Sequence, residues 1–277
     1  MRYHIDTIPV WDAMKLNSEC PLCSIRRNTE CMDIHRFLGA SVMEPDTRIL
    51  VNDKGFCMSH QAMLFREANK LGHALMMHTH MMDTEQKLNK LYKKMLSAVH
   101  DNVRAGFLRG VTGKNSEGKK TLTEACHEME ILSCACVICD SLRDNLNRYA
   151  YTFLHLWKTD DAFQKAFTAS KGLCVPHTAL LIRLSSEILP ADRHETFIEQ
   201  LVKLQTDHLK RLEEELHFFT KKFDYRNQNI PWGENRNAVE RSINALQSQC
   251  VGEASHPKEK RHIKPADTES GQYLHHE

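Results

Sequence analysis

Cysteine and histidine are the residues of this chain whose types and spacing most clearly allow chemistry. The sequence contains 10 Cys and 17 His among 277 residues. Two C-x2-C pairs occur, one at Cys20 and Cys23 and the other at Cys136 and Cys139. Two thiolates at this spacing can converge on a single metal ion. The pairs therefore indicate metal binding or thiol redox chemistry.

Each C-x2-C pair is followed by the pattern G-x-C-x2-H, whose cysteine comes after 33 or 34 intervening residues. The first copy of this pattern contributes Cys57 and His60, and the second contributes Cys174 and His177. Lysine precedes the glycine in both copies, and alanine and leucine recur after the histidine. Chance explains such agreement poorly, so the chain contains an internal repeat. Each half supplies three thiols and one imidazole.

Three thiolates and one neutral imidazole complete a tetrahedral shell around Zn²⁺, which is typical of a structural zinc site. We expect two zinc ions, each bound within one half of the chain. The two predicted ligand sets are Cys20, Cys23, Cys57 and His60, and Cys136, Cys139, Cys174 and His177. Exchange of ligands between the halves is the alternative pairing. An iron–sulfur cluster is the alternative cofactor, because three Cys and one His can hold one.

Other cysteines and histidines have weaker claims to chemistry. Cys126 and Cys134 lie near the second C-x2-C pair, where one could serve as a substitute ligand or a resolving thiol. Residues 73–82 include three His and four Met, but their helical spacing favours core packing over a copper or haem site. His208 lies on an apolar stripe, so we expect a hydrogen-bonded core histidine there.

The elements that must position these residues are predicted to be helices. Apolar residues recur every three or four positions through 142–156 and 192–223, which is the period of a helix facing a core. Weaker patterns predict further helices over 24–43, over 61–105 with a possible bend at Gly72, and over 177–190.

Few local signals depart from this helical pattern. Residues 48–51 form the only short strand candidate. Thr121 and Asp192 each precede a glutamate by three residues, which predicts a capping box at the start of a helix. We therefore predict an all-α fold, a pseudo-symmetric helical bundle built from two similar halves.

A stretch at 106–120 that holds four glycines among polar residues predicts a linker between the halves. We predict a first helical metal-binding repeat at residues 1–112 and a second at 113–249. The remaining residues, 250–277, contain little that could pack and are predicted to form a disordered tail.

The overall composition excludes several classes of protein. Hydrophobic residues make up 41% of the chain and charged residues 26%, as in globular proteins. Lys+Arg number 37 and Asp+Glu 36, so no net field favours nucleic acid or an anionic membrane. No stretch approaches the roughly 20 apolar residues of a membrane span, and the N-terminus lacks the apolar stretch of a signal peptide. We expect a cytoplasmic protein, whose thiols remain reduced, without a membrane or nucleic-acid partner.

Four segments of the chain carry a family resemblance. They are Cys20-Pro21-Leu22-Cys23, Met43-Glu44-Pro45-Asp46, Gly55-Phe56-Cys57 with His60, and Asp144-Asn145-Leu146-Asn147-Arg148-Tyr149. Together they resemble a bacterial family catalogued as domain of unknown function 6062, over about residues 1–225. The resemblance implies a cytosolic bacterial protein with CPxC and GxCxxH motifs, and it implies no activity. The second C-x2-C pair departs from the family pattern, because Val137 replaces the proline.

The chain shows no motif that would make it an enzyme. H-E-x-x-H, G-x-S-x-G and phosphate-binding G-x4-G-K patterns are absent. We therefore predict a metal-binding helical protein that acts as a binding or adaptor module for a protein partner. The alternative is a thiol-based redox or metal sensor, because spare thiols lie near the second pair. A metalloenzyme with an open coordination position is a third hypothesis.

Overall fold

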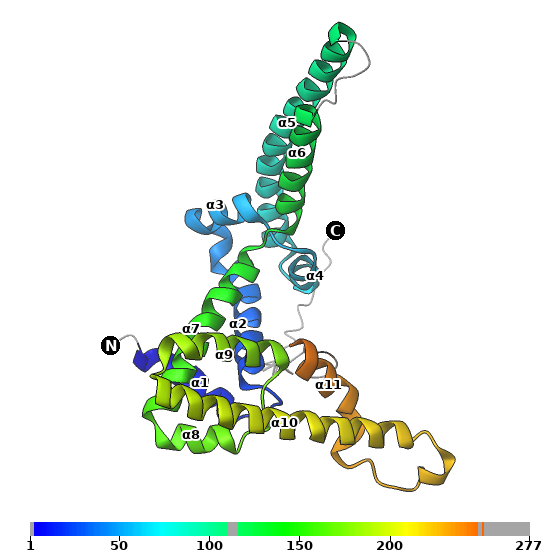
Figure 1. Ribbon diagram of the computed structural model, residues 1–277. Coiled ribbons are helices and arrows are strands. Elements are labelled where there is room, and N and C mark those ends of the chain that lie inside the picture. The colour runs from blue at the N-terminus through cyan, green and yellow to red at the C-terminus, as the bar shows by residue number, and fades with distance from the viewer. Residues whose placement is uncertain (1–2, 110–115, 249–250, 252–277) are drawn as a thin grey trace, which may run out of the picture.

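The protein folds into helices, as the sequence periodicity predicts (Figure 1). Its structure is a computed structural model that describes residues 3–109, 116–248 and 251, and no strand occurs among them. The α-helices are α1 (Tyr3–Lys15), α2 (Pro21–Leu38), α3 (Pro45–Lys54), α4 (Met58–Arg66), α5 (Lys70–Arg109), α6 (Ser116–Cys134), α7 (Val137–Thr159), α8 (Asp161–Thr168), α9 (Val175–Ile188), α10 (Ala191–Lys221) and α11 (Ala238–Gln247). Short 3₁₀ helices are η1 (Ala40–Met43), η2 (Tyr225–Asn227) and η3 (Gly233–Asn237).

The helices follow one another in the same order in both halves of the chain. In each half a C-x2-C pair opens a helix, α2 or α7, and the G-x-C-x2-H pattern opens another, α4 or α9. The next helix is the longest of its half, with 40 residues in α5 and 31 in α10. Within the described residues, no helix is both long and apolar enough to cross a membrane.

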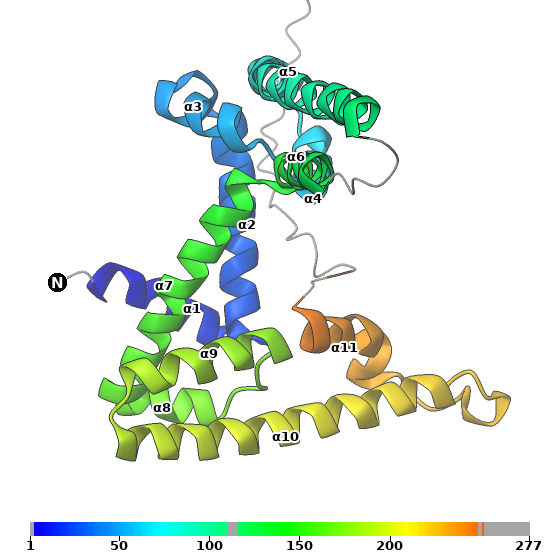
Figure 2. The same cartoon turned by 45° about the horizontal axis from the view of Figure 1, so that its top comes forward.

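Helices α2 and α7 pack side by side along the middle of the molecule and run in opposite directions (Figure 2). The start of α2 shares one hydrophobic cluster with the end of α7, and the end of α2 shares another cluster with the start of α7. The start of each helix carries a C-x2-C pair. The antiparallel packing therefore places the two pairs at opposite ends of the α2–α7 pair.

Two hydrophobic cores surround these two ends. The first core, which we call the Trp157 core, gathers residues from α1, α2, α7, α8, α9 and α10. Its rings meet edge to face, with centroids 5.0 Å apart for Trp157 and Phe197 and 4.9 Å apart for Phe153 and Phe163. The second core, the Phe37 core, gathers residues from α2, η1, α3, α4, α5 and α7. Both cores combine residues from the two halves of the sequence. The division of the chain into repeats at 1–112 and 113–249 stays a prediction.

Helices α5 and α6 form a hairpin that projects from the rest of the molecule (Figure 1). The predicted linker at 106–120 is therefore shorter than expected, because α5 continues to Arg109 and α6 begins at Ser116. Residues 110–115 lie outside the described part of the chain. Thr121 lies inside α6, so the capping box predicted at that residue does not start the helix. The predicted tail at 250–277 also lies outside the described residues, apart from Val251.

The helix boundaries near the first cluster of motifs differ from the prediction. The single helix predicted over 61–105 is two helices, because Asn69 interrupts it: its Oδ1 accepts a hydrogen bond from the Gly72 amide at 2.9 Å, and its Nδ2 donates to the Leu38 carbonyl at 2.6 Å. The strand candidate at 48–51 is wrong, since these residues lie within α3. Proline at position 45 begins that helix rather than ending the preceding one, which stops at Leu38.

Other elements were missed or differ at their ends. The helix predicted from 192 is present as α10, but Pro190 is its N-cap residue and Asp192 makes no cap. Helices α1 and α11 were not predicted. Helix α1 has only a weak amphipathic pattern, whereas α11 has a clear one but is short, and it ends at Ser248, which adopts a left-handed conformation with φ of 58°.

Candidate metal centres

The eight predicted ligands meet in two groups, but in the exchanged pairing rather than the expected one. The group we call the buried cluster consists of Cys20, Cys23, Cys174 and His177. The group we call the outer cluster consists of Cys57, His60, Cys136 and Cys139. In each group, the ligand atoms lie within 4.8 Å of one another. The expected pairing within each half of the chain is therefore wrong for this structure.

The antiparallel α2–α7 pair explains the exchange. It carries the first C-x2-C pair to the Trp157 core, where α9 begins, and the second pair to the Phe37 core, where α4 begins. At the outer cluster, the Val137 amide donates a hydrogen bond to the Gly55 carbonyl at 3.1 Å, which joins the second C-x2-C segment to the first G-x-C-x2-H segment. Each C-x2-C pair thus meets the G-x-C-x2-H segment of the other half.

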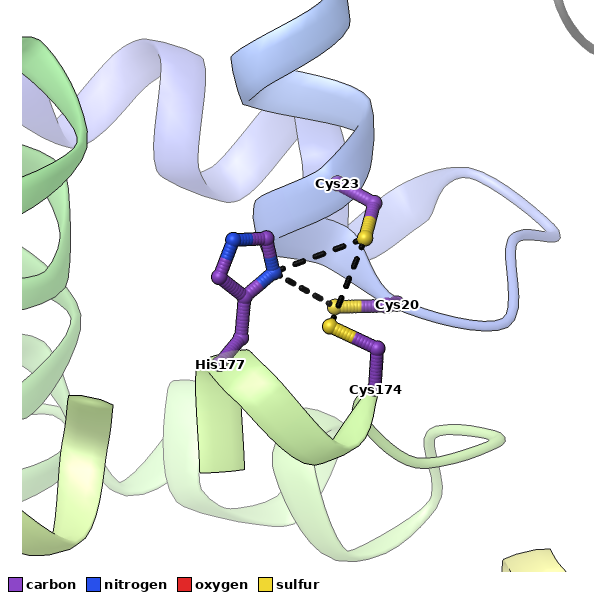
Figure 3. A group of neighbouring side chains, drawn as sticks. All are labelled: Cys20, Cys23, Cys174 and His177. Carbon is purple, nitrogen blue, oxygen red and sulfur yellow. Dashed lines mark hydrogen bonds between the residues drawn. The ribbon is translucent and has the colours of Figure 1, made fainter. Parts of the chain in front are cut away.

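In the buried cluster, the three sulfurs lie on one side of the His177 ring and point toward one of its nitrogens (Figure 3). His177 Nδ1 lies 3.3 Å from Cys20 Sγ and 3.4 Å from Cys23 Sγ, and Cys23 Sγ lies 3.5 Å from Cys174 Sγ. All four residues are buried. A tetrahedral Zn²⁺ with ordinary bond lengths would have edges of about 3.6 Å between sulfur and nitrogen and about 3.8 Å between sulfurs. The spacing of these atoms fits such an ion.

The outer cluster has the same arrangement of atoms. His60 Nδ1 lies 3.3 Å from Cys57 Sγ, 3.2 Å from Cys136 Sγ and 3.4 Å from Cys139 Sγ. The sulfurs of Cys57 and Cys139 are 3.7 Å apart. Cys139 is exposed and Cys57 half-buried, in contrast to the enclosed thiols of the buried cluster. The two groups therefore share ligand chemistry and differ in access from solvent.

A glycine with positive φ shapes the loop before each G-x-C-x2-H helix. Gly55 has φ of 63° and Gly172 has φ of 135°, a region that disfavours residues with a side chain. A Cβ at either glycine would also clash with a histidine ring, that of His80 at Gly55 and that of His208 at Gly172. The recurring glycine thus allows both the turn and the close approach of a ring from the following long helix.

The lysine before each glycine forms an ion pair beside the partner C-x2-C segment. Lys54 Nζ lies 2.5 Å from Asp140 Oδ2, next to the outer cluster. Lys171 Nζ lies 3.6 Å from Glu19 Oε1, next to the buried cluster. Each recurring lysine therefore helps to hold its loop against the motif from the other half.

Glu19 is the centre of a buried polar network beside Cys20. Its carboxylate accepts hydrogen bonds from His208 Nε2 at 3.1 Å, from Arg211 Nη2 and from Arg241 Nη1 at 3.2 Å. Burial raises the pKa of Glu19, but these hydrogen bonds and the charge of Arg211 lower it well below its usual range. The prediction that His208 is a hydrogen-bonded core histidine is confirmed.

The outward nitrogen of each histidine also has a partner. His60 Nε2 lies 3.1 Å from Glu30 Oε1, and His177 Nε2 lies 3.5 Å from Ser248 Oγ. Ser248 Oγ also lies 3.3 Å from Cys23 Sγ. Partners of this kind hold a metal-binding imidazole in the correct tautomer and orientation. A carboxylate performs this role in the outer cluster and a hydroxyl in the buried cluster.

The thiols within each group cannot all be ionised without a cation. In the buried cluster, burial and the neighbouring thiols raise the pKa of Cys20, and the hydrogen bond with Cys174 raises that of Cys23 to about 12. The same hydrogen bonds from Cys20 and Cys23 lower the pKa of Cys174 far below its usual range. The proximity of the three thiols thus favours ionisation of Cys174 and opposes that of Cys20 and Cys23, and a divalent cation would supply the charge that three thiolates require.

The outer cluster behaves similarly, but its histidine takes part. Burial opposes ionisation of Cys136, yet the hydrogen bond with His60 and two backbone amides lower its pKa to about 6. Burial and the charge of Cys136 raise the pKa of Cys139 to about 12. Burial opposes the charge of His60, whereas hydrogen bonds with Cys136 and Glu30 raise its pKa to about 10. Without metal, this group is a thiolate–imidazolium pair.

The remaining candidate residues lie outside both groups. Every described cysteine is a free thiol, and Cys31, Cys126 and Cys134 belong to neither cluster. In the 73–82 segment, His73 Nε2 lies 2.7 Å from Gln61 Oε1 and His80 Nδ1 lies 2.9 Å from the Asn52 carbonyl, so these histidines serve packing and hydrogen bonding.

Three residues of the sites were not predicted. Glu19, Glu30 and Ser248 contact the ligands or their neighbours from positions up to 225 residues away in the chain. The position of Glu19 directly before the first C-x2-C pair is the one weak sequence signal for its role. No sequence signal pointed to Ser248.

Comparison with known proteins places the chain in a family without assigning it a function. No curated protein and no solved structure matches it. A family model described as a family of unknown function, DUF6062, matches residues 1–253. That match includes all eight cluster residues and helix α11, and it extends further along the chain than the resemblance seen in the sequence motifs. The chain therefore belongs to the DUF6062 family of unknown function.

Proposed function

We propose that this protein is a cytoplasmic zinc protein in which two structural Cys3His sites hold a helical scaffold together for binding a protein partner. The observation that carries the proposal is the pair of donor groups, in each of which three sulfurs and one imidazole nitrogen lie within 4.8 Å of one another. Four protein ligands close the shell of Zn²⁺ and leave no position for substrate, which favours a structural role over catalysis. An iron–sulfur cluster is the alternative cofactor.

The pairing between halves strengthens the structural interpretation. Each ion would join a C-x2-C helix of one half to a G-x-C-x2-H helix of the other, so that both ions close long loops in the chain. The equal order of helices in the two halves supports a pseudo-symmetric origin for this arrangement. Metal binding would then contribute directly to folding, as in other proteins whose structural sites form only in the folded state.

Elemental analysis of anaerobically purified protein tests both the metal and the pairing. Wild type should contain two zinc ions per chain. A Cys20→Ser and Cys174→Ser double variant should retain one ion, because both residues belong to the buried cluster. A Cys20→Ser and Cys57→Ser double variant should lose both ions, because it damages both clusters. Pairing within halves would reverse these two results. Iron together with visible absorbance would indicate an iron–sulfur cluster instead of zinc.

The exposure of the outer cluster favours redox or metal sensing as a second candidate function. Cys57 and Cys139 are accessible, and their sulfurs lie 3.7 Å apart. Hydrogen peroxide would oxidise one thiolate to a sulfenic acid with release of hydroxide. The second thiolate would then displace hydroxide to form a disulfide, and the zinc ion would lose two ligands and dissociate.

Peroxide treatment with a zinc indicator tests this second function. One zinc ion per chain should be released, and mass spectrometry should detect a disulfide between Cys57 and Cys139. Cys126→Ser and Cys134→Ser variants are the controls, because these exposed thiols lie outside the cluster. Retention of both ions at peroxide concentrations that oxidise Cys126 would contradict a sensor role and leave the structural proposal unaffected.

A further inference from the structure

A large cavity lies beside the buried cluster and is not used by either metal site. It has a volume of about 1380 Å³ and is bounded by α1, by α2 and, from the C-terminal part of the chain, by η3, α11 and Val251. The sulfur-bearing residues Cys20 and Cys23 lie at its edge, but most of its lining comes from residues without a role in the clusters. Its volume exceeds that of most small-molecule sites.

One face of α2 provides a continuous wall of this cavity. Ser24, Arg27, Asn28 and Met32 line it, at 4, 7, 8 and 12 residues after the metal ligand Cys20. Such spacing places side chains on the same side of a helix. Along α2, the chemical character of the wall therefore changes from the metal ligand Cys20 to the charged Arg27 and then to the apolar Met32.

The cavity also exposes apolar side chains. Leu16 is 58% exposed and Met32 is 64% exposed, and both belong to the lining together with Pro9, Ile25 and Tyr149. Apolar side chains gathered in a concave site are typical of binding pockets for organic molecules. A ligand with an apolar body would cover them.

Two polar groups of the same lining lack partners. The Nε and Nη2 atoms of Arg27 are shielded from solvent and have no hydrogen-bond partner among the described residues, and the same holds for the Ser18 hydroxyl. Both residues line the cavity. A buried polar group without a partner costs free energy, which is larger for a charged group. These atoms have almost no exposed surface, so they do not face the cavity in this structure; a ligand that the Arg27 side chain turned to meet would supply the acceptors that the guanidinium lacks.

The geometry of Arg27 specifies the chemistry of those acceptors. Nε and Nη2 form one edge of the guanidinium, which carries two parallel N–H donors and matches the two oxygens of a carboxylate or phosphate. Two of the other cations in the lining are already paired, since Lys171 and Arg241 lie 3.6 Å and 3.2 Å from the Glu19 carboxylate, and Arg236 is exposed to solvent. Arg27 therefore has the unpaired edge.

We propose that this cavity binds an organic anion, whose carboxylate or phosphate pairs with Arg27 and whose apolar body lies against Leu16 and Met32. Because the unpaired edge does not face the cavity in this structure, the proposal requires a rotation of the Arg27 guanidinium that brings this edge to the anion. The acidic residues of the lining do not oppose the anion. The Glu19 charge is balanced by its cations, and the Asp12 carboxylate lies 3.9 Å from Lys15 Nζ. Glu234 and Glu240 belong to the other wall, formed by η3 and α11.

Calorimetric titration of the metal-loaded full chain with three eight-carbon probes tests the proposal. Octanoate and octyl phosphate should bind at one site per chain, and octanol should bind at least tenfold more weakly, since it has the apolar body without the charge. The ratio of the two anion affinities distinguishes a carboxylate ligand from a phosphate ligand. Failure of both anions to bind, or equal binding of octanol, would overturn the proposal.

Substitutions locate the site. Arg27→Gln should weaken binding of the preferred anion at least tenfold, and Arg27→Lys should restore it only in part because lysine lacks the paired donors. Arg236→Gln is the matched control, since it removes an exposed charge from the same lining and should change the affinity less than twofold. Unchanged binding in Arg27→Gln would place the anion elsewhere and refute the assignment.

A variant away from Arg27 keeps the test decisive if Arg27→Gln does not fold. Met32→Glu places a negative charge on the exposed apolar wall and should also weaken anion binding at least tenfold. Its metal content should equal that of wild type, because Met32 contacts neither cluster. Normal binding in this variant would contradict the proposed position of the apolar body, whatever the outcome for the two metal sites.

Discussion

The buried and outer clusters have the same ligands but different surroundings. The buried cluster lies within the Trp157 core, with all four residues enclosed and Ser248 covering His177. The outer cluster lies at the edge of the Phe37 core, with an exposed Cys139 and a carboxylate, Glu30, on its histidine. Identical donor sets can therefore serve different purposes. Enclosure favours permanent structural binding, and exposure favours exchange or reaction.

Loss of one ligand from each cluster should give the largest difference. With zinc bound as proposed, Cys174→Ser should reduce the free energy of unfolding by at least about 4 kcal/mol, since it removes a metal ligand from the middle of a core. Cys57→Ser should cost about half as much, because the outer cluster is partly exposed and water can solvate the groups that lose their ion there. Urea unfolding monitored by circular dichroism measures both.

Cys126→Ser provides the control for these variants. Its exposed thiol belongs to no cluster, so the substitution should change the unfolding free energy by less than about 0.5 kcal/mol. Equal losses from Cys174→Ser and Cys57→Ser would show that the difference in burial has no energetic consequence.

The ion pairs beside the two clusters should contribute different amounts to the free energy of unfolding, with a smaller difference than that between the ligand variants. Glu19→Gln leaves Arg211 and Arg241 without their buried carboxylate and should cost about 3 kcal/mol. Asp140→Asn removes a more exposed partner of Lys54 and should cost at most about 1 kcal/mol. Thermal and urea unfolding at pH 7 measure both values.

The pH dependence of the Glu19→Gln effect gives a second check. The folded state lowers the pKa of Glu19, so its stabilising contribution is complete above the ordinary pKa of glutamate, about 4.3. It is lost only as the pH falls below that value. The difference between wild type and Glu19→Gln should therefore stay constant from pH 7 to about pH 5. A difference that already decreases at pH 6 would contradict the network described here.

Alanine substitutions at the two loop glycines should show a still smaller difference in the free energy of unfolding. Gly172→Ala should cost about 2 kcal/mol, because the added Cβ meets the enclosed His208 ring, whose side chain is 0% exposed and cannot turn away. Gly55→Ala should cost about 1 kcal/mol, since the less enclosed His80 can move. Gly233→Ala, with φ of 54° and open space around it, measures the backbone strain alone. Equal costs at all three positions would exclude a contribution from the histidines.

Thiol accessibility should show the smallest difference. N-ethylmaleimide should modify Cys139 at least tenfold faster than Cys20 in the metal-loaded protein, which corresponds to about 1.4 kcal/mol in activation free energy. Peptide mass spectrometry over a time course measures the order, with exposed Cys126 as the fast reference. Faster labelling of Cys20 than of Cys139 would reverse the assignment of the clusters as buried and outer.

The sequence identified the ligands because the chemistry of a metal site is local in part. A C-x2-C pair needs only one helical turn, and the recurrence of Gly, Cys and His in the second half made coincidence improbable. The helical period of residues 142–156 was equally clear, since a single face of α7 meets the core. Boundaries were less predictable. Asn69 breaks a helix through contacts with Leu38 and Gly72, one of which is distant in sequence.

By itself, the amino-acid sequence determined the all-α fold, the eight cysteines and histidines and their division into two kinds of motif. Tertiary structure alone decided which motifs meet. Either pairing satisfies the spacing and the valence of the ligands, and the choice depends on the direction in which α2 packs against α7. That direction depends on the two hydrophobic cores, one of which contains Phe37 and Val137 and the other Cys20 and Phe153. These residues are at least 100 positions apart in each core, so they come together only when the chain folds.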